Sequence, residues 1–533
     1  MSHRVHTTGG WRWATLGVLC VSLLLISIDN TVLNVALPSI VREMGADSSQ
    51  LQWIVDAYAV VFAGLLLSMG SLGDRIGRKK VFVFGLATFA LGSAGSAWSG
   101  SPDRLVATRA IMGIGAAAIM PSTLSILTNV FTRENERARS IGIWSATAGL
   151  GVAIGPMFGG WLLVHFWWGS VFLVNVPIAA AGLVASIWLV PDSRDPVARP
   201  PDVPGALLST VGLALLLWGI IEAPSRSWTS PFVIGALAAA AVVVTAFVLW
   251  ERHTDHPMLP LRFFGMRRFS AAISSLAMVL FALLGMFFLV TQYLQFALGY
   301  DPLQTGLRVG PIALVLLVVA PLSVVLARRF GTKPVVAGGM LCIAVALGLL
   351  SRTTTATTYP DLVPAFLLLG IGAGLAMAPS TESVMGSLPL AQAGVGSATS
   401  DTALQVGGAL GVGVLGTLLN LRYQSLLTPL LAHHAIPTEV SGLILGSLGG
   451  ALAVAGHVGG PTGAALAAGS RHAFISGMDL GLLVASLVVG VAGVVVLMVL
   501  PNRGAPEAAG RAAGGHRDSE PVGPPGDRAG TPT

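Results

Sequence analysis

The fold is decided by the stretch Gly70-Ser-Leu-Gly-Asp-Arg-Ile-Gly-Arg-Lys-Lys-Val-Phe82, a short charged turn between two apolar runs. The runs on either side, 51–72 and 81–100, are each long enough to cross a bilayer, which takes about 20 residues. Charged side chains are costly in hydrocarbon, so the turn must lie at a membrane surface. The sequence therefore predicts two membrane-spanning helices joined by a tight surface turn.

The composition of the whole chain agrees with this prediction. Its 533 residues are 54% hydrophobic and 10% charged, and the mean hydropathy is +0.78. Soluble domains carry about 25% charged residues, so we expect an integral membrane protein. Both cysteines, Cys20 and Cys342, lie inside apolar runs, and neither a disulfide framework nor a metal site is expected.

Counting apolar runs of spanning length predicts an all-α membrane protein with fourteen transmembrane helices. We expect these runs to span as helices, because the backbone groups have no water partner in lipid and a helix pairs them internally. The predicted domains are a cytoplasmic N-terminus at 1–12, a six-helix bundle at 13–190, two extra helices at 204–250, a second six-helix bundle at 270–500, and a disordered cytoplasmic tail at 501–533. The second bundle includes a long extracellular segment at 420–473, with an apolar stretch, Val440–Leu452, that is too short to span.

The positions of the basic residues predict the orientation of the chain. With the N-terminus inside, most of the 30 lysines and arginines fall in the cytoplasmic segments, as the positive-inside rule requires. Both termini are therefore expected in the cytoplasm, and the net charge of +6 does not indicate nucleic-acid binding. The many Ala, Gly, Val and Arg residues beside only three lysines suggest a high-GC bacterium.

An internal repeat supports a division into six, two and six helices. The stretch Gly113-Ile-Gly-Ala-Ala-Ala-Ile-Met-Pro-Ser-Thr123 reappears, with one inserted residue, as Gly370-Ile-Gly-Ala-Gly-Leu-Ala-Met-Ala-Pro-Ser-Thr381. Parallel repeats of six helices are found in secondary transporters, which hold their substrate between the two halves. The sequence therefore predicts two pseudo-symmetric bundles.

Several of these motifs resemble those of one transporter family. The opening stretch has the form G-x-L-x-D-R-x-G-R-K-K and resembles the loop between helices 2 and 3 of the major facilitator superfamily. Ile28-Asp-Asn-Thr-Val-Leu-Asn-Val-Ala-Leu-Pro38 and Leu51-Gln-Trp-Ile-Val-Asp-Ala-Tyr58 resemble helices 1 and 2 of its fourteen-helix drug:proton antiporters, of the EmrB/QacA type. The resemblance implies that the loop acts as a conformational latch, formed by Gly70, Gly73, Asp74, Arg75, Gly77 and Arg78.

The predicted fifth helix carries the pattern G-x-x-x-G-P-x-x-G-G, which resembles the antiporter motif of this superfamily. Its residues are Gly151, Gly155, Pro156, Gly159 and Gly160. The proline removes a backbone donor and bends the helix, and the glycines permit close helix contact. A plain packing motif is the alternative, because small residues at this spacing are common in membrane helices.

Three charged residues are predicted at similar depths in the outer half of the membrane: Asp29, Asp56 and Arg109. With a rise of 1.5 Å per residue, each lies several ångströms below the outer end of its helix, where an unpaired charge is costly. Our hypothesis is that Arg109 pairs with Asp29 or Asp56 and that protonation of the acid breaks the pair; a static structural pair is the alternative. Arg109 lies in Leu105-x-x-x-Arg-x-x-x-Gly-x-Gly, which resembles the helix 4 motif of the same superfamily, and that motif usually has Gln where this sequence has Met112. Asp401, deep in a later helix, is a fourth candidate for proton coupling.

The substrate is weakly indicated by the sequence. A tentative cavity lining comprises Asn34, Tyr58, Gln292, Tyr293, Phe296, Glu382 and Gln405. Ordinary packing or lipid contact is an equally good interpretation for the aromatic members of this set.

The function indicated by these patterns is proton-coupled efflux of lipophilic, often cationic, compounds by alternating access. The expected partners are the small-molecule substrate, protons and the lipid bilayer, with no nucleic acid, and a monomer is expected. No cofactor besides the proton gradient is expected, because no G-x-x-x-x-G-K-[ST] loop occurs. A membrane-embedded enzyme is disfavoured because no D-D-x-x-D cluster is present. An exporter dedicated to one endogenous metabolite, such as an antibiotic or siderophore, remains the alternative.

Overall fold

The computed structural model describes residues 9–194, 202–255, 257–259, 261–388, 393–432 and 437–501, and all regular elements within these ranges are helical. The first half contains α1 (Gly9–Met44), α2 (Ser48–Ile76), α3 (Arg78–Ala97), α4 (Pro102–Val130), α5 (Glu134–His165), α6 (Ser170–Leu173) and α7 (Asn175–Leu189). Then come α8 (Val203–Arg226) and α9 (Pro231–His253). The second half contains η1 (Leu261–Gly265), α10 (Arg267–Gln292), η2 (Tyr293–Ala297), α11 (Pro302–Phe330), α12 (Thr332–Leu350), α13 (Tyr359–Met385), α14 (Ala393–Ala432), α15 (Thr438–Gly446), α16 (Leu448–Val458) and α17 (Gly460–Val499).

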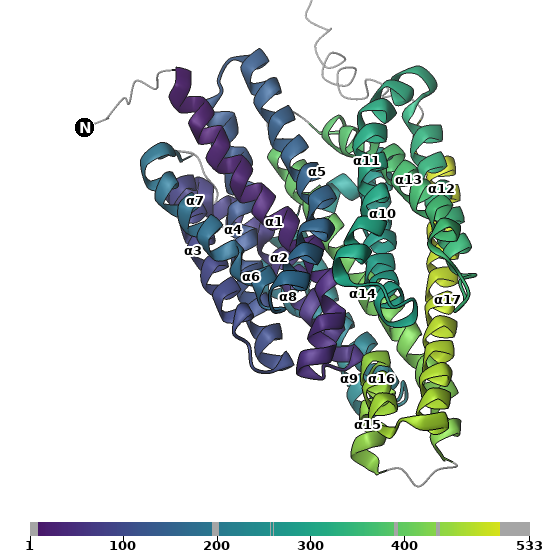
Figure 1. The fold of residues 1–533 in the computed structure, drawn as a ribbon. Helices are drawn as coiled ribbons and strands as arrows, with labels where there is room; N and C mark the ends of the chain where they lie inside the picture. Colours follow the sequence, from purple (N-terminus) through teal and green to yellow (C-terminus); the bar gives the residue numbers. More distant parts are fainter. Residues whose placement is uncertain are drawn as a thin grey trace, which may run out of the picture.

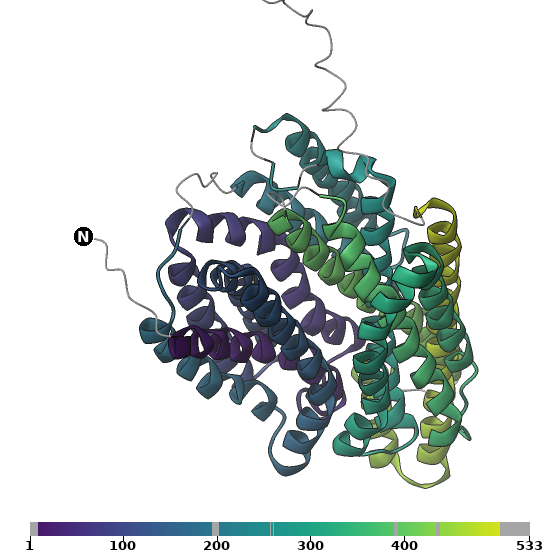
Figure 2. The same ribbon diagram turned by 90° about the horizontal axis from the view of Figure 1, so that it is seen from above.

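Fourteen of the described helical segments are long and apolar enough to cross a membrane. The predicted all-α, fourteen-helix membrane architecture is therefore confirmed. Figure 1 shows the first half, in purple and blue, beside the second half, in green and yellow, with most helices running in a common direction. Seen from above, the two halves remain separate groups of helices (Figure 2).

The sequence repeat corresponds to equivalent packing in the two halves. A methyl group on Gly113 would lie 2.7 Å from the carbonyl oxygen of Tyr58 in α2, and one on Gly370 would lie 2.5 Å from that of Ile312 in α11. On the other face, Gly115 lies against α3 and Gly372 lies against α12. Thus α4 packs between α2 and α3 as α13 packs between α11 and α12, which makes the halves pseudo-symmetric.

The two halves meet near the end of the molecule that carries α15 and α16, at the bottom of Figure 1. Gln295 links them there, because its Oε1 accepts a hydrogen bond from Arg42 Nη2 at 3.0 Å and its Nε2 donates to the carbonyl oxygen of Val35 at 2.9 Å. Gly160 of α5 also lies directly against the backbone of Pro302 in α11. This end of the molecule is closed between the halves.

The extra helices flank the first half and cover part of the junction with the second. Thr210 of α8 lies against Gly64 of α2. Leu217 and Ile221 of α8 are fully buried in a cluster with Val60 of α2 and with α14. By contrast, only 17% of the most apolar window of α9 is buried in the protein. Helix α8 is therefore part of the structural junction, whereas α9 faces mainly outward.

The segment 420–473 differs from the expected long loop, because most of its described residues are helical. Helix α14 continues to Ala432, and its last turns bury Tyr423, whose hydroxyl donates to the carbonyl oxygen of Ile444 at 2.9 Å. The apolar stretch forms two helices, because Ser447 interrupts it and accepts a hydrogen bond from the Gly450 amide at 3.1 Å. The predictions for 1–8 and for the tail beyond Pro501 lie outside the described residues.

Candidate functional site

A buried ion pair joins α1 to α4 in the first half. Arg109 Nη1 lies 2.6 Å from Asp29 Oδ2, and the two side chains are each 1% exposed. The second carboxylate oxygen of Asp29 accepts a hydrogen bond from Asn175 Nδ2 of α7 at 3.0 Å. Asn175 in turn contacts Ser93 Oγ of α3 at 3.4 Å. Of the two partners considered for Arg109, the structure selects Asp29.

The guanidinium of Arg109 is held on several sides. Its Nε donates to the carbonyl oxygen of Ile54 at 3.2 Å, and its carbon atom lies 4.4 Å from the centre of the Tyr58 ring. Phe172 of α6 lies on the same group at 5.9 Å, and Met112 Sδ is 3.7 Å from Nη1. Met112 thus occupies the position of the expected glutamine with only a weak acceptor. Tyr58, predicted to line a cavity, is 1% exposed and belongs to this cluster.

Because the Asp29–Arg109 ion pair is buried, a change in the charge of either partner is costly. Removing one partner of a buried ion pair leaves an uncompensated charge and costs roughly 3–5 kcal/mol. Neutralising Asp29 without moving Arg109 would be unfavourable for this reason, since a neutral acid no longer balances the guanidinium. The ion pair and the hydrogen bond from Asn175 therefore fix α1, α4 and α7 to one another.

Asp56 lies apart from this pair, in the contact between the two halves. It is 0% exposed, and neither of its carboxylate oxygens has a hydrogen-bond partner. A methyl group on Gly413 of α14 would lie 3.4 Å from Asp56 Oδ2 and 2.8 Å from Leu217 of α8. The carboxyl group is thus enclosed by α2, α14 and α8. Nearby, Thr417 of α14 contacts Gln52 Oε1 at 3.5 Å.

The other predicted acids lie in the second half. Asp401 is half-buried on α14, and its carboxylate forms no hydrogen bond or ion pair with the described residues. Glu382, near the end of α13, is exposed, and Gln405 is half-buried one turn beyond Asp401. The structure does not join these three residues to Asp29 or Arg109.

The predicted latch joins elements within the first half. Gly77 separates α2 from α3 with φ +121°, a conformation that favours glycine. Arg78 Nε pairs with Asp74 Oδ1 at 2.7 Å, and its Nη1 donates to the Ser125 carbonyl of α4 at 3.3 Å. Gly70 and Gly73 lie against α4, next to Pro121 and Ser122 respectively, whereas Arg75 is exposed. The latch therefore fixes α2, α3 and α4 to one another.

The predicted antiporter motif places α5 between α1 and α11. Gly151, Gly155 and Gly159 face α1, where methyl groups would meet Ser27, Thr31 and Val32. Gly160 and the backbone of Pro156 face α11, in contact with Pro302 and Gly306. One face of the motif packs within the first half, and the other contacts the second half.

The remaining cavity candidates lie mainly in packed surroundings. Asn34 and Gln292 are 2% and 5% exposed and each donates to a carbonyl oxygen of its own helix. The Tyr293 hydroxyl donates to the Thr354 carbonyl oxygen at 2.8 Å. The Phe296 ring lies 5.5 Å from the guanidinium of Arg42, at the closed end.

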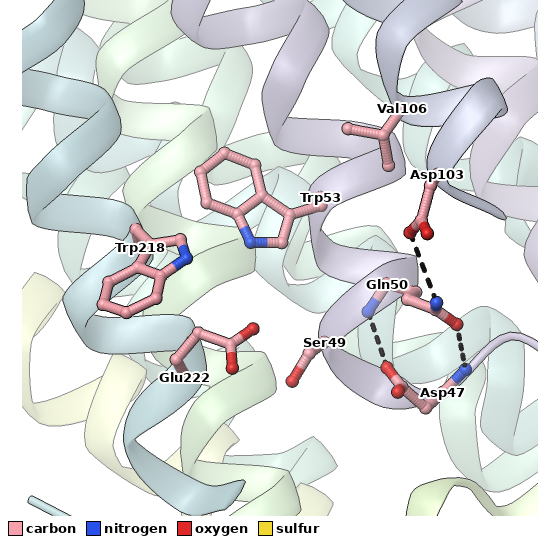
Figure 3. A pocket seen from close by; sticks show the side chains of 8 residues that line it. All are labelled: Asp47, Ser49, Gln50, Trp53, Asp103, Val106, Trp218 and Glu222. Atoms are coloured by element: carbon pink, nitrogen blue, oxygen red, sulfur yellow. Dashed lines mark hydrogen bonds between the residues drawn. The ribbon is translucent and has the colours of Figure 1, made fainter. Parts of the chain in front are cut away.

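A pocket that is open to solvent lies at the end where the two halves are in contact, between α2, α4 and α8 (Figure 3). It has a volume of about 420 Å³ and is lined by Asp47, Ser49, Gln50, Trp53, Asp103, Val106, Trp218 and Glu222. Glu222 pairs with Arg226 at 3.1 Å. Burial raises the pKa of Asp47, and the charges of Glu222 and Asp103 act in the same direction. The sequence prediction missed this pocket, because its two tryptophans come from helices 165 residues apart in the chain.

Fourteen spans, twelve of them in two pseudo-symmetric halves, with charged side chains enclosed between helices, define a membrane transporter. The chain belongs to the Major Facilitator Superfamily, whose sequence profile matches residues 19–412. The multidrug efflux pump LfrA of Mycolicibacterium smegmatis is 36% identical over 484 residues, which cover 91% of this chain and 95% of that protein. The tetracenomycin C resistance and export protein of Streptomyces glaucescens is 33% identical, with 93% and 94% covered.

Among solved structures, a bacterial homolog of the human lysosomal transporter Spinster, in an inward-facing and occupied conformation, has the same fold. Its TM-score is 0.65 at 17% identity, and the alignment covers 94% of this chain and 100% of that one. The predicted relationship to drug:proton antiporters is confirmed by the relatives. The chain is an efflux transporter rather than an enzyme, and a multi-pass membrane protein.

Proposed function

We propose that this protein exports lipophilic, often cationic, compounds in exchange for protons. The observation that carries the proposal is Asp56, a fully buried carboxyl group without a partner in the contact between α2 and α14. Burying an unpaired ionised carboxylate is very unfavourable, so the group is buried in its neutral form. Closure of this end of the molecule therefore requires a proton on Asp56.

The half of the transport cycle in which this end is closed requires a proton on Asp56. With both termini in the cytoplasm, as the basic residues favour, the closed end faces outward and the substrate path opens inward. When this end opens, water reaches Asp56, the proton equilibrates with the outside, and the ionised acid prevents closure. Uptake of a proton from outside thus permits closure, and its release toward the cytoplasm ionises Asp56 and favours reopening, so that one proton moves inward in each cycle.

The Asp29–Arg109 pair supplies a second element of the cycle. In the closed state the pair is intact and Asn175 holds the free oxygen of Asp29. Arg109 also donates to the carbonyl oxygen of Ile54, on the same helix as Asp56. A movement of α2 that exposes Asp56 therefore also disturbs the donors around Asp29. This connection lets the two acids respond to one conformational change.

The outer pocket supports cationic compounds as the substrate class. Indole faces attract organic cations, and the pocket combines Trp53 and Trp218 with the carboxylates of Asp47, Asp103 and Glu222. Half-buried Asp401 offers an acidic side chain deeper in the molecule. A positively charged aromatic compound thus finds acids at two levels, and one of these sites lies next to the exit.

The test is transport of ethidium by purified protein in liposomes, driven by an imposed pH gradient. Wild-type protein should transport ethidium only with the gradient and lose this activity when an ionophore is added. Asp56→Asn should abolish gradient-driven accumulation but keep ethidium–ethidium exchange, because the amide can be buried without a proton. Glu43→Gln, which removes an exposed acid on α1, is the matched control and should behave as wild type.

Two results would overturn the proposal. Unchanged gradient-driven transport by Asp56→Asn would remove Asp56 from proton coupling. Transport of no member of a panel of cationic dyes, together with transport of one antibiotic or siderophore, would instead establish the dedicated exporter. The relative named for tetracenomycin C export makes that second panel worth including.

A further inference from the structure

Two buried acids lie side by side where α8 begins and α9 ends, far along the chain from the Asp29–Arg109 pair. Asp202 directly precedes α8 and is 8% exposed, and Glu251 in the last turn of α9 is 3% exposed. A methyl group on Gly205 would meet Asp202 Oδ2 and would lie 2.9 Å from Glu251 Oε1. These two oxygens therefore face the same point.

Each acid uses its other oxygen to hold the structure. Asp202 Oδ1 accepts hydrogen bonds from the Gly205 amide at 2.9 Å and from Trp250 Nε1 at 2.8 Å. Glu251 Oε2 accepts one from the Leu259 amide at 3.0 Å. Asp202 Oδ2 and Glu251 Oε1 are both buried and have no hydrogen-bond partner. Two oxygens that can only accept hydrogen bonds thus lie together without a donor.

No described cation compensates for these charges. On α9, Arg252 and His253 are exposed, and His253 Nδ1 contacts the Leu249 carbonyl oxygen of its own helix. Arg262 of η1 lies over the Phe263 ring at 5.2 Å, and Asp255 is exposed. Helix α2 contributes Ser68, which donates to the Asp202 carbonyl oxygen at 3.3 Å. Among the described residues that pack here, the only charged group facing either acid is the other acid.

We propose that Asp202 and Glu251 share one proton and form a second proton-binding site, separate from Asp56. A single proton turns one carboxyl group into a donor, supplies both free oxygens with a hydrogen bond, and removes the repulsion between like charges. No group of three or more metal-binding side chains is found in the described residues, which makes a proton the occupant that this donor set favours.

The shared proton fixes the extra helices to the transport core. Asp202 caps α8 and bonds to Trp250 of α9, while Ser68 connects its backbone to α2. Loss of the proton at alkaline pH leaves two adjacent buried negative charges, which push the start of α8 away from the end of α9. Helix α2 also carries Asp56, to which the proposed function gives a role in transport. The contact of α8 and α9 with this helix therefore depends on the protonation of the Asp202–Glu251 pair, and so on pH.

The test uses the full-length protein in nanodiscs and two readouts. Infrared spectra should contain a protonated carboxyl band that disappears at alkaline pH and is missing from Glu251→Gln. The thermal midpoint of the wild type should fall as the pH rises above about 4, where an unfolded carboxyl group loses its proton, and should stop falling once the folded state has also released the shared proton. Glu251→Gln and Asp202→Asn should flatten this fall, since an amide donates to the remaining acid without a proton.

The exposed neighbour Asp255→Asn is the matched control and should keep the wild-type pH response. The proposal is overturned if the infrared band and the pH-dependent fall of the thermal midpoint persist in both amide variants. It is also overturned if Mn²⁺ or Ca²⁺ stabilises the wild type at alkaline pH and Glu251→Gln abolishes this effect, because the pair would then be a cation site. Infrared detection does not depend on transport, so failure here leaves the role of Asp56 unaffected.

Discussion

At the scale of single residues, the first half of the molecule is organised by the donors of Arg109. The guanidinium reaches Asp29, the Ile54 carbonyl oxygen and the Tyr58 ring at once. Its planar, forked donors suit such a site better than a lysine ammonium, which is a point charge. Arg109 lies four residues before Gly113 in the sequence repeat. The equivalent position in the second half, four residues before Gly370, is occupied by the fully buried Phe366. Only the first half carries the pair.

We expect Asn175→Ala to destabilise the protein by about 1–3 kcal/mol, the usual cost of leaving a buried polar group without its partner. The change removes the 3.0 Å hydrogen bond to Asp29 Oδ1. Chemical unfolding in detergent, followed by tryptophan fluorescence, measures the loss. Ser93→Ala removes only the 3.4 Å contact to the same amide and should cost much less. Equal effects of the two variants would show that Asn175 does not act through Asp29.

Much of this site could be predicted from sequence, and the rest depends on how helices are rotated. Counting residues from helix ends placed Asp29 and Arg109 at similar depths, and the structure joins them. The sequence does not assign a role to Asn175, because the pattern of residues around it does not show which side of α7 faces α1. The sequence likewise could not separate Asp29 from Asp56 as partner, since both acids are predicted at comparable depths.

At the scale of elements, α5 is held so close to its neighbours that it tolerates only glycine at several points. Gly155 lies against Thr31 of α1, and Gly160 against the backbone of Pro302. Small residues permit such contact in membranes, where tight packing rather than the hydrophobic effect drives helix association.

Gly155→Ala should therefore destabilise the protein, by roughly 1–3 kcal/mol as for overpacked interiors, and should slow transport. The added methyl group overlaps Thr31 Oγ1. Gly142→Ala provides the control on the same helix, because nothing lies within 4 Å of its added methyl group. Alanine is the better helix former, so this variant should be neutral or slightly stabilised. The thermal midpoints and ethidium efflux rates of the two variants test this prediction. Similar losses of stability and transport rate in both variants would contradict the packing argument.

Two departures from the expected elements have identifiable causes. Tyr293–Ala297 forms a π turn at the end of α10, which inserts a residue and shifts the facing of the side chains. Tyr293 and Phe296 consequently point to the closed end, although the sequence suggested a cavity. Helix α14 runs beyond the apolar limit expected at 419 because Tyr423 and Leu427 are buried on one face. Hydropathy alone underestimates a helix whose last turns are amphipathic.

At the scale of the whole molecule, the mechanism that we propose makes closure of one end depend on the protonation of Asp56. Cysteines introduced at the exposed positions Arg104 and Arg352, with Cys20 and Cys342 replaced by alanine, allow spin labels on the two halves. The distance between labels should increase as the pH rises, because the ionised acid cannot be buried. In Asp56→Asn the distance should stay short at every pH. A wild-type distance that does not respond to pH would contradict this mechanism.

The pair α8–α9 adds an even number of crossings between the repeats. Parity is what keeps both repeats oriented alike in the bilayer, so a hairpin can be gained there without inverting everything that follows it. In this chain, however, Leu217 of α8 and the Asp56 carboxylate both lie against Gly413 of α14. Removing the hairpin would therefore uncover the Asp56 carboxyl group on this side, and a twelve-helix version of the chain would need a neutral residue at that position.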